Sequence, residues 1–536
     1  MVDNGAGESE LGRGRGNAPT KEGLPVLKDP VPFQPSPEDQ AVFHALVPYD
    51  HYLRRAVQLI DLPRWRDEAA RYYSPDLGRP AEEPLLMLKL EFLQYHDNLS
   101  DRQVIARSQT DVAYRWFLGL GMKDGLPDPS LLSYFRGRLG VEGHQRIFDA
   151  LVGQAREHGL VKDRLRIKDA THVVADVAIP STLALLAQMR EKLLAAAKPF
   201  DRLRVEGERA RAAMLHDDTQ QKQEERLLAR VMHLREILGW VDELPTPADA
   251  DRQRDWEKLQ AARQLAHKIL ADQENPKAGD QTRSTVDPDA RRGKHGEWYD
   301  GFLLDVMIDP ESEFFTAINV LAANGDEAAD AAELVRREEA AQGNDIQALS
   351  IDGAGFNGPL LRELEDPAGL ALDVYVPPKQ ESQEGRFGPD DFVEEAQRGV
   401  VRCPAGQQSR YRERDSKQRA TIFRFARTTC ADCPQRPQCM EKTPGHFGRS
   451  VRKNDYQAEY DRVRQKAQTA EYAEVRKEHP KVERKLSELV RRHGARRARY
   501  RGLGKLLCQE LMSGVVANAK RLVGLLGAWG NLPALC

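Results

Sequence analysis

Residues 165–176 read LRIKDATHVVAD, and they predict the strand around which the rest of the chain is organised. Side chains alternate along it in the way typical of a short strand, which puts Asp169 on the same face as Ile167 and Val173. A carboxylate on an apolar face is costly unless it is paired or bound to a metal. A single Asp of this kind is more often a salt-bridged residue at a strand edge, so the choice depends on the rest of the chain.

The composition bounds the kind of protein. A chain of 536 residues can hold two to four domains and bury a sizeable core. The formal net charge of -3 hides a basic segment at 481–505, where ten Lys or Arg stand against only Glu483 and Glu488. A polyanion partner is predicted for that segment. No apolar run approaches the roughly 18 residues of a membrane span, and residues 1–30 lack a signal peptide's apolar stretch, so we expect a soluble, cytoplasmic protein.

The segment from about 38 to 159 has helical patterns. A buried helix is predicted at 84–93, and Ser100 with Gln103 forms a capping box that opens a second helix. A further helix at 129–139 presents Arg136 and Arg138. Compact helices with short turns suit a helix-turn-helix-like DNA-binding head that reads DNA with these two arginines. A plain helical bundle with surface arginines explains the same residues equally well.

Strand patterns resume later in the chain. Residues 301–308 and 314–320 predict a hairpin that turns at Asp309-Pro310, and 346–351 and 372–376 predict two more strands separated by helices. This order is typical of a mixed-sheet α/β core. The intervening segment, about 182 to 274, is rich in Leu, Ala, Glu and Arg and predicts an inserted antiparallel helical hairpin.

Four of the six cysteines cluster, with the spacing C-x26-C-x2-C-x5-C. The close pair Cys430 and Cys433 can put two thiolates on one tetrahedral ion, and Cys403 and Cys439 would complete a structural zinc site. Two disulfides are the alternative, which a reducing cytoplasm disfavours. Cys508 and Cys536 have no partners in sequence.

Three acids stand on different predicted elements: Asp169 on the first strand, Asp352 at the end of a later strand, and Glu483 on a helix at 481–490. At about 100° per residue, Glu483 is predicted beside the buried stripe of that helix and Glu488 in solvent. Such oxygen ligands can converge on two Mg²⁺ ions, or Mn²⁺ in their place, at a phosphodiester. The arginines that follow would bind phosphates; they are Arg491, Arg492, Arg496, Arg497, Arg499 and Arg501.

At these residues the chain resembles the DDE transposases of bacterial insertion sequences. The resemblance is nearest to the branch with a cysteine-rich insertion, related to the group with a Tyr-Arg-Glu-Lys signature. The matching stretches are LPDPS at 126–130, DATH at 169–172, SIDGAGF at 350–356, Cys403-Pro404 with the later cysteines, PKVERK at 480–485 and RYRG at 499–502. Where that signature has Tyr, Arg and Lys, this chain has Arg476, His479 and Val490.

The resemblance covers roughly residues 40 to 525 and implies an RNase H-like core with Asp169, Asp352 and Glu483 as catalytic triad. The expected units are a disordered tail at 1–36, a helical DNA-binding domain at 37–160, the core at 161–180 and 281–380, a helical insertion at 181–280, a zinc-binding insertion at 381–450, and C-terminal helices at 451–530 that complete the core.

The expected activity is Mg²⁺-dependent cleavage at transposon ends followed by strand transfer into target DNA. The expected assembly is a homodimer on double-stranded DNA, acting at the nucleoid. Two alternatives remain: a DNA-binding protein descended from a transposase that no longer cuts, and a metal-dependent nuclease on the same core.

Overall fold

The computed structural model describes residues 27, 33–74, 81–216, 222–379, 386–417 and 419–529. Most of the tail predicted at 1–36 therefore lies outside the described residues, as does Cys536. Within the described ranges, no helix is both long and apolar enough to cross a membrane.

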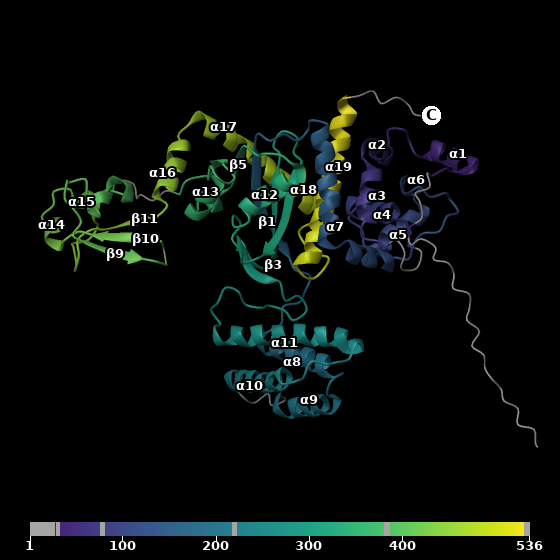
Figure 1. Ribbon diagram of the computed structural model, residues 1–536, viewed down its shortest axis with the longest axis horizontal. Coiled ribbons are helices and arrows are strands. Elements are labelled where there is room, and N and C mark those ends of the chain that lie inside the picture. The colour runs from purple at the N-terminus through teal and green to yellow at the C-terminus, as the bar shows by residue number, and fades with distance from the viewer. Residues whose placement is uncertain are drawn as a thin grey trace, which may run out of the picture.

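A mixed sheet forms the centre of the molecule (Figure 1). Its middle strand is β1 (Arg166–Val174), which runs antiparallel to β3 (Glu297–Ile308) and parallel to β5 (Ala348–Ser350). The other strands are β2 (Arg291–His295) and β4 (Phe315–Ala322), which both pair with β3, and β6 (Asp373–Tyr375), which pairs with β5. The order β4-β3-β1-β5-β6 thus has antiparallel pairs on one side of β1 and parallel pairs on the other.

The predicted α/β fold class with a mixed sheet is confirmed, and each strand predicted for the sheet is present, whereas β2 was not predicted. β3 differs in one respect, because it begins at Glu297 rather than Gly301. Its polar first residues pair with β2 instead of β1, so they carry no apolar pattern.

The two faces of the sheet are covered by different helices. On one face α12 (Ala331–Gln342) and α13 (Gly358–Leu364) pack on Met307 and Leu349. On the other face Leu304 and Val306 pack in one apolar cluster with α7 (Ser130–Glu157), α18 (Pro480–Arg492) and α19 (Leu503–Trp529). Successive residues of β3 thus serve opposite layers, as the pleat of a strand requires.

The N-terminal helices share that second apolar cluster with the sheet. α7 and α19 lie side by side between the sheet and these helices (Figure 1). The capping box of Ser100 and Gln103 is present, as predicted. The N-terminal helices are α1 (Pro37–Leu46), α2 (Tyr52–Leu59), α3 (Leu62–Ala70), α4 (Pro84–His96), α5 (Asp101–Thr110) and α6 (Val112–Leu118).

Two units project from the sheet, each with an apolar cluster of its own. One, inserted between β1 and β2, has four helices rather than the predicted hairpin: α8 (Thr182–Ala197), α9 (Arg202–His216), α10 (Gln223–Asp242) and α11 (Gln253–Glu274). The other is the unit that contains the clustered cysteines. Its elements are β7 (Val393–Glu395), β8 (Val400–Arg402), β9 (Tyr411–Asp415), β10 (Ala420–Arg424), α14 (Arg427–Ala431), α15 (Arg436–Cys439) and β11 (Ser450–Asn454).

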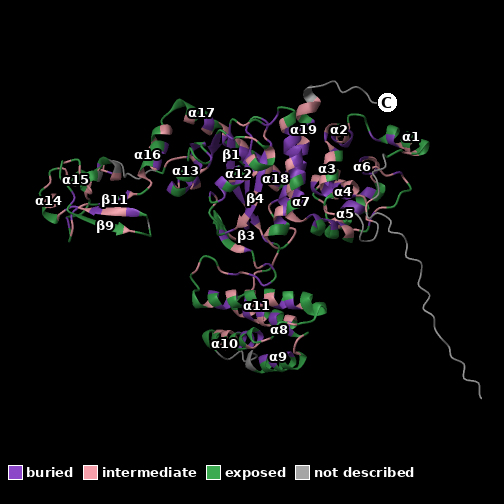
Figure 2. Ribbon diagram, in the orientation of Figure 1, coloured by how far each residue is buried: buried purple, intermediate pink, exposed green. Residues whose placement is uncertain are grey.

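Figure 2 shows buried residues gathered in the sheet and in α7 and α19, whereas the projecting units have exposed outer faces. The chain returns from the cysteine unit to the sheet through α16 (Gln457–Lys466) and α17 (Ala470–Glu478), which lead into α18.

Candidate active site

The parallel register of β1 and β5 places two of the three predicted acids at the same level of these adjacent strands. Ile167 pairs with Ser350, and Asp169 and Asp352 each follow two residues later. The Asp169 carboxylate accepts a hydrogen bond from the N–H of Ala170 at 2.9 Å. Asp352 accepts one from the N–H of Ala354 at 3.0 Å and so caps the short turn that follows β5.

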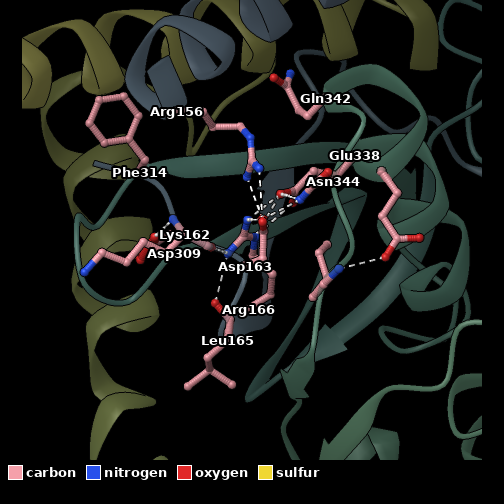
Figure 3. A network of polar contacts seen from close by, with 12 residues as sticks. Arg156, Lys162, Asp163, Leu165, Arg166, Asp309, Phe314, Glu338, Gln342 and Asn344 are labelled. Atoms are coloured by element: carbon pink, nitrogen blue, oxygen red, sulfur yellow. Dashed lines mark hydrogen bonds and ion pairs between the residues drawn. The ribbon is translucent and has the colours of Figure 1, made fainter. Parts of the chain in front are cut away.

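A polar network fixes the beginning of these two strands (Figure 3). Arg156 of α7 donates two hydrogen bonds to Asp163, at 2.6 and 3.1 Å. Asn344, just before β5, donates to the same carboxylate at 2.8 Å. Arg166 at the start of β1 is fully buried and pairs with Glu338 of α12 at 2.6 Å. The β1–β5 register is therefore anchored at the end of the strands that precedes the two aspartates.

Glu483 lies on α18, which packs against β1, but the predicted helical phase is wrong. Glu483 is exposed, whereas Glu488 is half-buried and pairs with Lys485 at 2.6 Å. The reason is that the buried stripe runs through Val482, Leu486 and Leu489 and includes the Lys485 side chain, rather than centring on Val490.

The three acids are close enough for their charges to interact. Burial above all, together with the charges of Asp352, Glu483 and Glu327, raises the pKa of Asp169 to about 7. Glu327, in the turn between β4 and α12, is a fourth carboxylate that the sequence analysis missed. Its own pKa is raised by burial and by Asp352. No motif could have indicated it, because only the folding of that turn brings it to the site.

Arg476 of α17 is the cation beside these acids, and its charge interacts with those of Asp352, Asp169 and Glu483. Its Nη1 donates to the Ile351 carbonyl at 2.9 Å and to the Ser350 hydroxyl at 3.1 Å. Both acceptors directly precede Asp352. The position stood out in the sequence only because the related signature has Tyr there.

The arginines from Arg491 to Arg501, in the last turn of α18 and in the segment after it, fall into two sets. Arg496 donates to the Thr171 hydroxyl at 3.3 Å, and Arg499 donates to the Leu99 carbonyl at 2.7 Å, so both tie the segment to the rest of the fold. The other four are exposed: Arg491, Arg492, Arg497 and Arg501.

The prediction that Arg136 reads DNA is wrong. This side chain is buried, pairs with Asp101 of α5 at 2.6 Å and stacks over Tyr500. No local pattern indicated that an acid on another helix would pair with it. Arg138 is exposed, with its guanidinium 4.2 Å from the centre of the Tyr73 ring.

The four clustered cysteines line one cavity of about 30 Å³, whose other walls include Phe387, Phe392 and Met440. Burial raises the pKa of both Cys430 and Cys439, and the neighbouring thiols contribute to the shift. All four are free thiols. As the side chains stand, no group of three or more His, Cys, Asp or Glu in the described ranges is arranged to hold a metal ion, and this includes the cysteines and the acids.

Two family models match the chain. Residues 41–138 match the family described as Transposase domain (DUF772), and residues 402–523 match the family described as Transposase DDE domain. The second match contains Glu483 and the four cysteines, while Asp169 and Asp352 lie outside both. The uncharacterized protein ORF8 in the nfe locus of Rhizobium meliloti is 26% identical over 152 residues, which is 27% of this chain and 72% of that protein. No solved structure matches significantly.

Proposed function

For a chain that its two matched domains identify as a DDE transposase, an enzyme of DNA phosphoryl transfer, we propose that Asp169, Asp352 and Glu483 are the catalytic carboxylates. The observation that carries this proposal is the convergence of the three charges from β1, β5 and α18. The order β4-β3-β1-β5-β6, with Asp169 on its central strand, supports an RNase H-like core.

The donor set fits a hard divalent cation. Asp169, Asp352 and Glu483 would hold Mg²⁺ through carboxylate oxygens, and the charge of Arg476 interacts with those of all three. A carboxylate whose pKa is raised by burial and by like charges gains most from such a counter-ion. Bound there, Mg²⁺ would supply Lewis-acid stabilisation of a phosphodiester undergoing displacement.

The residues around the acids have separate tasks in this proposal. Arg476 holds the backbone before Asp352 and offers its remaining N–H groups to phosphate oxygens. The four exposed arginines at the end of α18 and just after it bind DNA backbone, which brings the duplex to the acids. The reaction is cleavage at transposon ends followed by attack of the freed 3′-hydroxyl on target DNA, with a homodimer handling the two ends.

The cysteine unit supports assignment to the branch with a cysteine-rich insertion, and we propose that it binds one structural zinc ion. Four thiols around one small cavity are the donor set that zinc prefers. On binding, the thiols would lose their protons, and the Zn²⁺ charge would draw the resulting thiolates inward.

The test is incubation of the purified protein with Mg²⁺ and DNA that carries the element's terminal repeats. Strand-transfer products are expected; nicks alone would indicate a nuclease, and a mobility shift without cutting would indicate a DNA-binding protein. Asp169→Asn, Asp352→Asn and Glu483→Gln should each abolish cleavage while the protein still binds DNA. Glu488→Gln, on the same helix, should keep cleavage. Loss of cleavage in Glu488→Gln but not in Glu483→Gln would overturn the triad.

A further inference from the structure

β2 and the first residues of β3 form a hairpin that reaches past the end of β1 on the side of the helical insertion (Figure 1). The turn is at Gly296, whose φ of 71° lies in the region that favours glycine. Residues 297–299 of β3 pair with β2 alone, while the Asp300 carbonyl still accepts a hydrogen bond from the N–H of Ala175 at 3.0 Å. Beyond β1 the hairpin is therefore a two-stranded ribbon with two separate faces.

One face of the hairpin packs onto the catalytic strand. The Tyr299 ring lies 5.0 Å from that of His172 on β1, and His172 lies 4.9 Å from His295. Gly293 is required opposite Tyr299, because a Cβ there would lie 2.9 Å from the Tyr299 ring and would clash with the Ala323 carbonyl oxygen. His172 stands three residues after Asp169. This face fixes the ribbon relative to the acids.

The other face presents an exposed aromatic ring between cations. Trp298 is 62% exposed. Its ring centre lies 5.1 Å from the guanidinium carbon of Arg292 and 5.8 Å from Nζ of Lys294. Within the described residues neither cation makes an ion pair with a carboxylate, in contrast to the adjacent Arg291, which pairs with Asp280 at 2.6 Å. The Arg292 and Lys294 charges are thus available to a polyanion.

The ribbon also lies near the catalytic acids. The charge of Glu327 interacts with those of both Asp352 and His295, so this turn joins the acids to the hairpin. A polyanion bound on the Trp298 face would therefore be held at a fixed position relative to Asp352.

We propose that Arg292, Lys294 and Trp298 form a binding site for an unpaired segment of the DNA strand on which the enzyme acts. Base stacking on an indole needs the face of a base, which a continuous duplex hides within its stack, while the two cations suit the flanking phosphates. A surface for duplex alone would use the cations and would gain little from an exposed indole. This inference rests on the proposed function, because it assumes a DNA substrate at the acids.

The test is a binding experiment in the Asp352→Asn protein without divalent metal, so that the readout does not depend on cleavage. The probes are an unstructured oligothymidylate and a blunt duplex. Trp298→Ala should weaken oligothymidylate binding about five- to one-hundredfold and duplex binding far less. Trp298→Phe should restore most of the affinity, because a phenyl ring still stacks.

A matched control is Tyr411→Ala in the cysteine unit, which removes another exposed aromatic side chain, one with a guanidinium 5.6 Å from its ring. This variant should bind both probes normally. Trp298 fluorescence gives a second readout: oligothymidylate should quench the parent protein more than Trp298→Phe. Equal affinities of Trp298→Ala and its parent for oligothymidylate, or equal losses on both probes, would overturn the site. Either result leaves the cleavage test of the carboxylates standing, and loss of cleavage activity leaves this binding test standing.

Discussion

The guanidinium of Arg476 lies 3.1 Å from Nδ1 of His479 and donates to it. A guanidinium has no acceptor, so Nδ1 must present its lone pair and the ring proton must be on Nε2. Burial, with the nearby Arg476 charge, lowers the pKa of His479 to about 4, which keeps the ring neutral near pH 7. The same Nη1 binds Ser350 and Ile351, so one nitrogen links the strand before Asp352 to the residue before α18.

Loss of this link should impair catalysis more than DNA binding. Arg476→Gln is expected to lower the cleavage rate on the order of ten- to one-hundredfold, because it lets the elements that carry Asp352 and Glu483 move apart. Affinity for terminal-repeat DNA should change little, and Arg476→Lys should recover part of the rate. Lys477→Gln is the control, since Lys477 is exposed on the same helix and pairs with Glu474. A parallel loss of DNA affinity in Arg476→Gln would contradict a positioning role.

Glu488 should matter for stability. Its carboxylate is the partner of Lys485, whose side chain is only 4% exposed. Glu488→Gln leaves that ammonium without a charged partner, so unfolding in urea should show a loss of roughly 1–3 kcal/mol. Lys485→Met in the same background should recover part of it, because the buried charge is then gone. A Glu488→Gln protein as stable as its parent would show that the pair is dispensable.

Glu510 of α19 predicts a pH dependence of stability. The residue is fully buried, and burial raises its pKa to about 8. The folded state therefore keeps a proton that the unfolded state releases above its ordinary pKa of 4.5, so stability falls as pH rises between these values. Glu510→Gln should match the parent near pH 4 and exceed it by up to about 4 kcal/mol near pH 8.

Urea unfolding at several pH values measures the Glu510 effect as the difference between variant and parent. Glu225→Gln, an exposed substitution on α10, is the control and should show no such trend. A difference that stays constant from pH 4 to pH 8 would mean that Glu510 titrates normally in the fold.

The exposed arginines should control the salt dependence of DNA binding. Neutralising Arg491, Arg492 and Arg497 should weaken binding to all duplexes alike and lower the slope of log K against log salt by up to about 0.9 per lost phosphate contact. Arg499→Gln should instead destabilise the fold, because Arg499 donates to the Leu99 carbonyl and stacks over Tyr95. Binding isotherms at several salt concentrations, beside thermal unfolding, separate the two effects. An unchanged slope in the triple variant would remove these residues from the DNA surface.

Zinc removal tests the cysteine unit. Replacing Cys430 and Cys433 by Ser should release one zinc ion per chain and destabilise the segment from about 399 to 447, because structural zinc contributes its binding free energy to folding. Metal analysis of the purified protein checks the stoichiometry. Cys508→Ser is the control, since Cys508 is a buried thiol of α19 and lies outside the cysteine unit. A zinc-free protein with a folded cysteine unit would refute the site.

The sequence predicted what depends on short-range periodicity. Alternation located β1 and β5, and the spacing of Ser100 and Gln103 located the start of α5. Predicting Asp169 and Asp352 as neighbours also needed the resemblance to known transposases, since periodicity alone says nothing of the parallel pairing of β1 with β5.

What failed depended on contacts between distant segments. The phase of α18 was wrong because a lysine occupies a buried position, and Lys485 is buried only because Glu488 lies within reach. Arg136 was misjudged because its partner Asp101 is 35 residues away. Glu327 could not be found, since a turn carries no periodic signal.

The contact between Arg496 and β1 has a consequence for when the enzyme becomes active. The N–H of Val174 donates to the Arg496 carbonyl, and the N–H of Ala498 donates to the Val174 carbonyl. The Arg496 side chain also donates to the Thr171 hydroxyl, and these two residues are 325 positions apart in the chain. A ribosome adding about 5–20 residues per second needs roughly 16–65 seconds to make that span. Throughout that time β1 lacks its contacts with the segment from Arg496 to Ala498, and Glu483 is either not yet synthesised or not yet packed against β1. With Asp169, Asp352 and Glu483 as the proposed catalytic carboxylates, a nascent chain therefore lacks a complete site, and cleavage of DNA by that site waits for nearly the whole polypeptide.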